Sequence, residues 1–179
     1  MNALFLDRDG VLNVLRMNDY VKCPDELELL PGVAEAVALC RDYFDYIFVV
    51  TNQQGVGRGL MTEADLEAVH RKLQSAVYGI DRIYYCTELE SAHSFCRKPN
   101  IGMALQARRE HKGLRLKDCT MVGDSMTDML FGRRAGMTTV LVGENSDVWK
   151  RRPTLVDRRF RTLLDFARSL ATAASSVRR

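Results

Sequence analysis

Short apolar segments alternate with longer amphipathic segments along most of the chain. Five of the short segments are almost continuously apolar, at residues 3–6, 46–50, 82–86, 119–122 and 138–142. Strands that are buried on both faces of a parallel sheet have this pattern, whereas strands with one face in water alternate apolar and polar residues. The pattern therefore predicts five buried parallel strands.

Between these strands, apolar residues recur every three or four positions, which is the spacing of a helix with one buried face. The predicted helices cover residues 33–43, 63–77, 102–111 and 126–134. Thr62 and Asp65 form an acidic variant of the capping box before the second helix. This alternation predicts an α/β fold with a central parallel sheet and right-handed crossovers. Because no repeat, linker or low-complexity tract interrupts it, we expect residues 1–179 to form one domain.

Polar residues gather directly after the predicted strands. Asp7, Asp9 and Gly10 follow the first strand, residues 51–54 follow the second, residues 97–99 come one loop after the third, and residues 123–128 follow the fourth. In open parallel sheets, ligands bind beyond the carboxyl ends of the strands. We therefore expect these residues to form one functional site at that edge of the sheet.

The acidic residues of this set can hold a metal ion. Asp7 and Asp9 would repel each other if they were close and bare, so one would become protonated unless a cation lay between them. Mg²⁺ prefers such oxygen ligands. Asp124 can complete the metal shell, and Asp128, one helical turn later, could orient it or bind a metal-bound water. Alternatively, Asp124 and Asp128 only cap a helix, and the first pair only caps a turn.

The remaining polar residues suit a phosphate group. Residues 51–59 form a glycine-rich loop in which the Thr51 hydroxyl and backbone N–H groups can donate to phosphate oxygens. Arg58 could bind a second anionic group. Lys98 could neutralise the charge of a transferring phosphoryl group. A flexible turn and a solvated lysine are the simpler alternatives for these two segments.

Composition and charge limit the class of protein. The five cysteines have no regular spacing, which favours reduced thiols, and no apolar segment is long enough to span a bilayer. We therefore expect a cytoplasmic protein. From Lys150 onward there are nine Lys or Arg and two Asp residues, a net charge of +7. Apolar residues at near-helical spacing favour a docked basic helix over a nucleic-acid-binding tail; they are Phe160, Leu163, Leu164, Phe166 and Leu170.

The ordered set of motifs resembles that of the haloacid dehalogenase-like (HAD) phosphohydrolases over about residues 3–142. The matching segments are Asp7-Arg8-Asp9-Gly10, Thr51, Lys98, and Gly123-Asp124 through Asp128. The resemblance implies a Rossmann-like three-layer sandwich and a Mg²⁺-dependent phosphatase with Asp7 as nucleophile and Asp9 as acid and base. It also implies that Thr51 and Lys98 hold the phosphoryl oxygens. Asp7, the backbone carbonyl of Asp9, and Asp124 would bind Mg²⁺.

Longer strings resemble one branch of this family, the heptose-bisphosphate phosphatases and histidinol-phosphatases. They are residues 5–13, residues 51–59 and Cys-Arg-Lys-Pro at 96–99. The resemblance favours a small phosphorylated sugar, a heptose 1,7-bisphosphate that loses its 7-phosphate, with Asn52, Arg58 and Arg97 touching substrate. Neither segment between the motifs is long enough for a large cap domain, and we expect a monomer without a nucleic-acid or membrane partner. Histidinol phosphate and a polynucleotide phosphate are the alternatives.

Many members of this branch hold a structural zinc with three cysteines and a histidine. Here Cys86 and Cys96 match two ligand positions, but Glu88 and Ser94 occupy the other two. His93 could supply a third ligand, so a structural Zn²⁺ is one alternative. Because a fourth ligand is missing, a short loop without metal is favoured.

Overall fold

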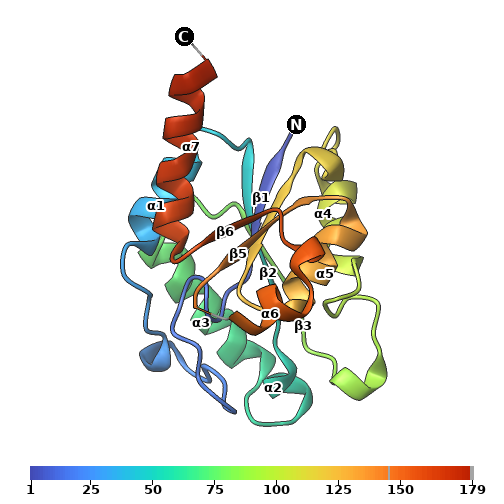
Figure 1. The fold of residues 1–179 in the computed structure, drawn as a ribbon. Coiled ribbons are helices and arrows are strands. Elements are labelled where there is room, and N and C mark those ends of the chain that lie inside the picture. Colours follow the sequence, from blue (N-terminus) through green and yellow to red (C-terminus); the bar gives the residue numbers. More distant parts are fainter. Residues whose placement is uncertain (145, 178–179) are drawn as a thin grey trace.

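Six parallel strands form one sheet at the centre of the protein (Figure 1). The computed structural model describes residues 1–144 and 146–177. The strand order is β3-β2-β1-β4-β5-β6, and every neighbouring pair is parallel. The strands are β1 (Ala3–Leu6), β2 (Tyr46–Asn52), β3 (Arg82–Cys86), β4 (Thr120–Gly123), β5 (Thr138–Val142) and β6 (Arg158–Phe160). The five predicted strands are confirmed, with small shifts at the ends of β2 and β4.

Seven α-helices lie in the described part of the chain. They are α1 (Val33–Cys40), α2 (Gln54–Gly57), α3 (Glu63–Ala76), α4 (Gly102–Glu110), α5 (Met126–Ala135), α6 (Ser146–Arg151) and α7 (Leu163–Val177). The four helices predicted between the strands are confirmed, and the capping box of Thr62 and Asp65 forms at the start of α3. Helix α1 ends three residues earlier than predicted, because a tight turn follows in which the N–H groups of Tyr43 and Phe44 donate to the Cys40 carbonyl.

The helices cover both faces of the sheet, which gives the predicted three-layer α/β sandwich. Helices α1, α3 and α7 pack on one face, where they share a core with Leu4, Leu6 and Ile47 (Figure 1). Helices α4 and α5 cover the other face over Phe5 and Phe48. Both faces of the central strands are therefore dry, as their continuous apolar sequences require.

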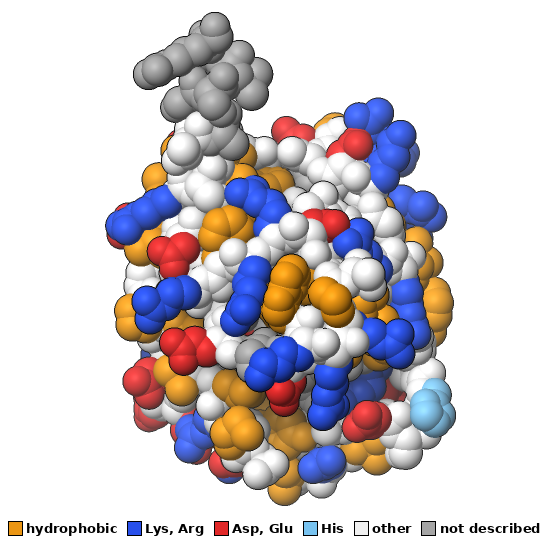
Figure 2. All heavy atoms as spheres, in the orientation of Figure 1, with side chains coloured by type: hydrophobic (Ala, Val, Ile, Leu, Met, Phe, Trp, Pro, Cys, Tyr) orange, Lys and Arg blue, Asp and Glu red, His pale blue; other side chains and the backbone are white. Residues whose placement is uncertain are grey.

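The basic C-terminal segment docks on the domain, as predicted. Phe166 and Leu163 of α7 are buried against the core, and Arg168 forms a surface ion pair with Glu35 of α1 at 2.9 Å. Basic side chains are interspersed with acidic and apolar ones on the face seen in Figure 2. The prediction was wrong for Phe160, which lies in the edge strand β6 and not in the helix. Within the described residues, no helix is long and apolar enough to cross a membrane.

Candidate active site

The four motifs converge at the carboxyl edge of the sheet. Asp7 directly follows β1, and its N–H donates to Val122 of β4 at 3.0 Å, so the two strands stay paired at the site. Thr51 lies at the end of β2. The motif residues open onto a cavity of about 280 Å³. Its lining consists of Asp7, Asp9, Leu15, Arg16, Asp19, Tyr20, Thr51, Asn52, Lys98, Asp124, Ser125 and Thr127.

Two glycines allow the loops after β1 and β4 to approach each other. Gly10 has a φ of 86°, and a side chain there would collide with the carboxylate of Asp124. A side chain at Gly123 would collide with Asp128. Only glycine fits both needs at position 10, because a positive φ disfavours any side chain.

Lys98 lies at the centre of the site and is almost completely buried. Its Nζ donates to Asp7 Oδ1 at 2.7 Å, to Asp128 Oδ1 at 2.6 Å and to the Val50 carbonyl at 2.8 Å. Burial alone would lower the pKa of Lys98, but Asp128 and Asp7 outweigh it and raise this pKa. The ammonium group is therefore charged and has an acceptor for each hydrogen.

Asp128 lies beside the acidic residues, and both of its oxygens accept hydrogen bonds. One of its oxygens accepts from Lys98, and the other accepts from the backbone N–H of Ser125 at 3.1 Å. The N-cap of α5 is Ser125, so the alternative in which Asp124 caps the helix is wrong. Asp128 thus links the start of α5 to the buried ammonium group.

Three carboxylates form a cluster that fits a divalent cation. Asp7, Asp124 and Asp128 each offer an oxygen, and these atoms lie within 4.8 Å of one another. Burial, followed by the charge of Asp128, raises the pKa of Asp7 to about 8, although Lys98 opposes both. Burial and Asp128 raise the pKa of Asp124 to about 7. A cation would relieve this repulsion, and the all-oxygen ligand set suits Mg²⁺.

The side chain of Asp9 is held apart from this cluster. Arg8 Nη2 donates to both of its oxygens at 3.0 Å, Asn13 donates at 2.9 Å and Gln53 donates at 2.8 Å. Burial alone would raise the pKa of Asp9, but Arg8 and the two amides lower it. Gln53 Nε2 also donates to Thr51 Oγ1 at 2.7 Å. Sequence reasoning missed the contacts of Gln53 and Asn13 with Asp9. Gln53 comes from a distant segment, whereas Asn13 reaches Asp9 from four residues along the same loop.

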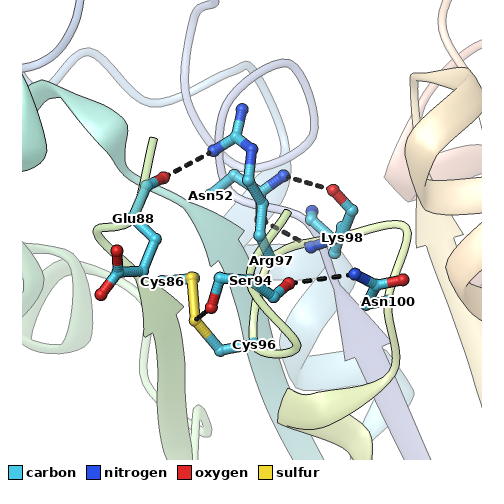
Figure 3. Close-up of a disulfide and its surroundings, with 8 residues drawn as sticks. All are labelled: Asn52, Cys86, Glu88, Ser94, Cys96, Arg97, Lys98 and Asn100. Carbon is cyan, nitrogen blue, oxygen red and sulfur yellow. Dashed lines mark hydrogen bonds between the residues drawn. A yellow bond between two sulfur atoms is a disulfide. The ribbon is translucent and has the colours of Figure 1, made fainter. Parts of the chain in front are cut away.

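Asn52, one of the predicted substrate contacts, fixes the segment that carries Lys98. Its side-chain amide donates to the Lys98 carbonyl at 3.1 Å and accepts from the Lys98 N–H at 2.9 Å (Figure 3). It also lines the cavity. The geometry therefore gives Asn52 a structural task at the site.

Arg58 and Arg97, the other predicted substrate contacts, lie outside the residues that line the cavity. Arg97 is half-buried, and its Nη1 donates to the Glu88 carbonyl at 3.4 Å (Figure 3). Arg58 is exposed. Burial lowers the pKa of Arg97, although Glu90 and then Tyr20, a cavity residue, oppose it; the charge of Arg58 lowers this pKa further. Arg97 is thus within electrostatic range of Arg58 and of Tyr20, which lines the cavity.

Cys86 and Cys96 form a disulfide, with their Cα atoms 5.6 Å apart (Figure 3). The prediction of reduced thiols is therefore wrong for this pair, whereas Cys23, Cys40 and Cys119 are free. Sulfur atoms that are bonded to each other cannot serve as thiolate ligands, and His93 is exposed. The structural Zn²⁺ alternative is not supported.

The sheet order, the acidic cluster and the buried lysine at the strand ends have the architecture of HAD-like hydrolases. A family model described as HAD-hydrolase-like matches residues 95–163. The solved structure of D,D-heptose 1,7-bisphosphate phosphatase from B. bronchiseptica, complexed with magnesium and phosphate, superposes with a TM-score of 0.86 at 32% identity. The match covers 97% of this chain and 99% of that one.

Relatives of known sequence agree with the structural match. D-glycero-alpha-D-manno-heptose-1,7-bisphosphate 7-phosphatase of Mycobacterium bovis is 42% identical over 71% of this chain and 69% of its own length. D-glycero-beta-D-manno-heptose-1,7-bisphosphate 7-phosphatase of Pseudomonas aeruginosa is 38% identical over 79% of this chain and 80% of its own length. The chain belongs to the family of HAD-like phosphatases that contains the heptose-1,7-bisphosphate 7-phosphatases. It is accordingly a phosphoric monoester hydrolase.

Proposed function

We propose that this enzyme removes the 7-phosphate of D-glycero-D-manno-heptose 1,7-bisphosphate in a Mg²⁺-dependent reaction, through an aspartyl-phosphate on Asp7. The observation that carries the proposal is the position of Asp7 at the end of β1, 2.7 Å from the buried ammonium group of Lys98 and within the acidic cluster. The names of the relatives and the magnesium and phosphate of the solved neighbour support the substrate and the metal.

Asp7, Asp124 and the backbone carbonyl of Asp9 would hold the metal ion. When bound, Mg²⁺ supplies positive charge that neutralises the carboxylates and the phosphoryl oxygens. The raised pKa values of Asp7 and Asp124 fit this assignment, because they reflect buried carboxylates that lack sufficient positive charge.

The side chains can carry out the two chemical steps in turn. A carboxylate oxygen of Asp7 bonds to phosphorus as the bond to the sugar oxygen breaks, and Asp9 gives that oxygen its proton. Asp9 then takes a proton from the water that attacks the aspartyl-phosphate, which releases inorganic phosphate and restores Asp7. Because Gln53 donates to Thr51 Oγ1, the Thr51 hydroxyl hydrogen is free to donate to a phosphoryl oxygen. The three hydrogens of Lys98 already point to Asp7, Asp128 and the Val50 carbonyl, so Lys98 would hold the phosphoryl group through its positive charge.

Arg58 and Arg97 would bind the phosphate that is not cleaved. Two nearby guanidinium groups repel each other, and a phosphate between them relieves that repulsion. The same charges disfavour histidinol phosphate, whose amine is cationic. We further propose one domain over residues 1–179 and a cytoplasmic monomer without a nucleic-acid or membrane partner.

Phosphate release from a panel of substrates tests the proposal. The panel contains both anomers of the heptose bisphosphate, histidinol phosphate and a 3′-phosphorylated oligonucleotide, each with Mg²⁺ and with EDTA. Strong Mg²⁺-dependent preference for either heptose bisphosphate is the expected result. Preference for another member would replace the substrate but retain the chemistry, and activity that survives EDTA would contradict the metal assignment.

A further inference from the structure

A buried chain of hydrogen bonds connects helix α3 to Asp9. Arg8 is fully buried, which is rare for an arginine. Its Nη2 donates to Asp9 and also to Gln53 Oε1, at 3.1 Å from the latter atom. On its other side, Nη1 lies 3.3 Å from Nε2 of His70. His70 is therefore two contacts away from Asp9, although the two residues are 61 positions apart along the chain.

His70 acts as a hydrogen-bond acceptor in this chain. An arginine has donors only, so the Nε2 atom that faces Arg8 must carry a lone pair, and the ring must be the neutral Nδ1–H tautomer. Burial and the charge of Arg8 support this state, because they lower the pKa of His70 to about 3. His70 is itself buried, with its ring 5.3 Å from that of Tyr85.

The guanidinium group of Arg8 depends on His70 Nε2 because it has few other hydrogen-bond acceptors. Its Nε atom is buried and has no hydrogen-bond partner. The guanidinium orientation is therefore set by Nη2, which binds Asp9 and Gln53, and by Nη1, which binds His70. Without His70, the group would lose its anchor on the side that faces away from Asp9.

We propose that His70 is a positioning residue, which anchors Arg8 so that Arg8, Gln53 and Asn13 fix the Asp9 carboxyl group for proton transfer at the sugar oxygen. The inference rests on the role proposed above for Asp9. The four hydrogen bonds that three donor groups make to the two oxygens of Asp9 define the plane of its carboxyl group. The side-chain amide of Gln53 donates to both Asp9 and Thr51, so it aligns the proposed acid with the proposed phosphoryl-binding hydroxyl.

The expected effect depends on the leaving group. General acid catalysis contributes roughly 10²–10⁴-fold, and a displacement of about 1 Å can cost on the order of 100-fold. A sugar alkoxide needs the proton of Asp9 to leave, whereas p-nitrophenolate leaves without one. We therefore expect loss of the His70 acceptor to slow cleavage of the sugar phosphate roughly tenfold and cleavage of p-nitrophenyl phosphate less than about twofold.

The experiment compares single-turnover rates of the Mg²⁺-loaded enzyme with the two substrates, because only the first chemical step expels the alcohol. His70→Phe keeps an aromatic ring but removes the acceptor, and His70→Gln restores one. The control is His111→Phe, the same change at a ring that packs on Tyr46 and Phe48 at 4.5 and 4.8 Å. His70→Phe should show the selective loss, His70→Gln should recover most of it, and the control should match the wild type.

Equal slowing of both substrates by His70→Phe, or no recovery in His70→Gln, would overturn the inference, since a structural defect alone predicts that result. Asp9→Asn serves as the reference. If it shows the leaving-group effect and His70→Phe does not, only the inference fails; if it shows none, the role of Asp9 fails as well. If His70→Phe does not fold, ¹⁵N NMR of wild-type His70 at pH 7 decides, because a protonated Nε2 contradicts its acceptor role.

Discussion

The acidic cluster predicts that Mg²⁺ affinity rises steeply as the pH increases from 6 to 9. In the metal-free site, burial and mutual repulsion raise the pKa of Asp7 to about 8 and that of Asp124 to about 7. Both groups are therefore largely protonated at pH 6 and largely ionised at pH 9. Since Mg²⁺ binds carboxylates and not carboxylic acids, its binding at low pH must displace protons.

The size of the change in Mg²⁺ affinity follows from the pKa values of Asp7 and Asp124. At pH 6, Asp7 lies about two pH units below its pKa and Asp124 about one unit below, which together weaken apparent affinity about 10³-fold, or about 4 kcal/mol. The slope of log affinity against pH should be close to two at pH 6 and close to zero at pH 9. Most of the change should therefore fall between pH 6 and 8.

Isothermal titration calorimetry with Mg²⁺ at pH 6, 7, 8 and 9 measures this dependence. Pairs of buffers with different ionisation enthalpies also count the protons released, about two per ion at pH 6. Asp128→Asn is the informative variant, because the charge of Asp128 raises both pKa values. Its affinity curve should shift to lower pH.

Thermal unfolding gives an independent check with a definite sign. In the metal-free protein, Asp7 binds a proton more tightly in the folded state than in the unfolded state, where its pKa is near 3.8. Stability should therefore fall as the pH rises from about 4 to 8, and saturating Mg²⁺ should remove most of this fall. An affinity that changes less than about tenfold from pH 6 to 9, without proton release, would refute the reasoning.

Four further predictions follow from the site and the core. Asp7→Asn should lower phosphate release more than about 10³-fold while circular dichroism shows a folded protein; near-normal turnover would exclude covalent catalysis at Asp7. Lys98→Met should cost about 3–5 kcal/mol in EDTA, seen as a fall in Tm of roughly 6–20 °C, because it leaves buried carboxylates unpaired; an unchanged Tm would contradict this. Phe166→Ala should cost about 3–5 kcal/mol in urea unfolding, whereas the exposed control Arg168→Ala should cost less than about 1 kcal/mol. Metal analysis should find no stoichiometric zinc, because Cys86 and Cys96 are joined in a disulfide, and one zinc per chain would contradict this prediction.

The sheet and the catalytic motifs could be predicted because their signals are local. Continuous apolar segments mark strands buried on both faces, and the polar residues that follow them must meet at one edge once the strands are parallel. The strand β6 escaped prediction because only Phe160 of its three residues is apolar, and that residue also fits the stripe of the following helix. An edge strand needs less apolar surface than a central one, so its sequence carries a weaker signal.

Contacts between distant segments could not be predicted in the same way. The Cys86–Cys96 disulfide depends on how the loop after β3 returns to the strand end, which spacing alone does not fix. Gln53 follows Thr51 in a loop that reads as polar and flexible, but it is fully buried. For His70 a signal did exist, since it shares the apolar face of α3 with Leu66 and Leu73 at helical spacing.

The pKa values of Asp7 and Asp9, the two acids of the first motif, are shifted in opposite directions. These shifts connect metal binding to catalysis. Without a cation, the pKa of Asp7 is raised and that of Asp9 is lowered, so a proton resides on the proposed nucleophile and not on the proposed acid. Positive charge near Asp7 and Asp124 lowers the pKa of Asp7, because it favours the ionised carboxylate. The lowered pKa of Asp9 must rise when substrate binds, since a phosphate brings negative charge close to Asp9 and favours its protonated form. The metal ion and the substrate together therefore favour an ionised Asp7 and a protonated Asp9, from which the leaving oxygen can receive its proton.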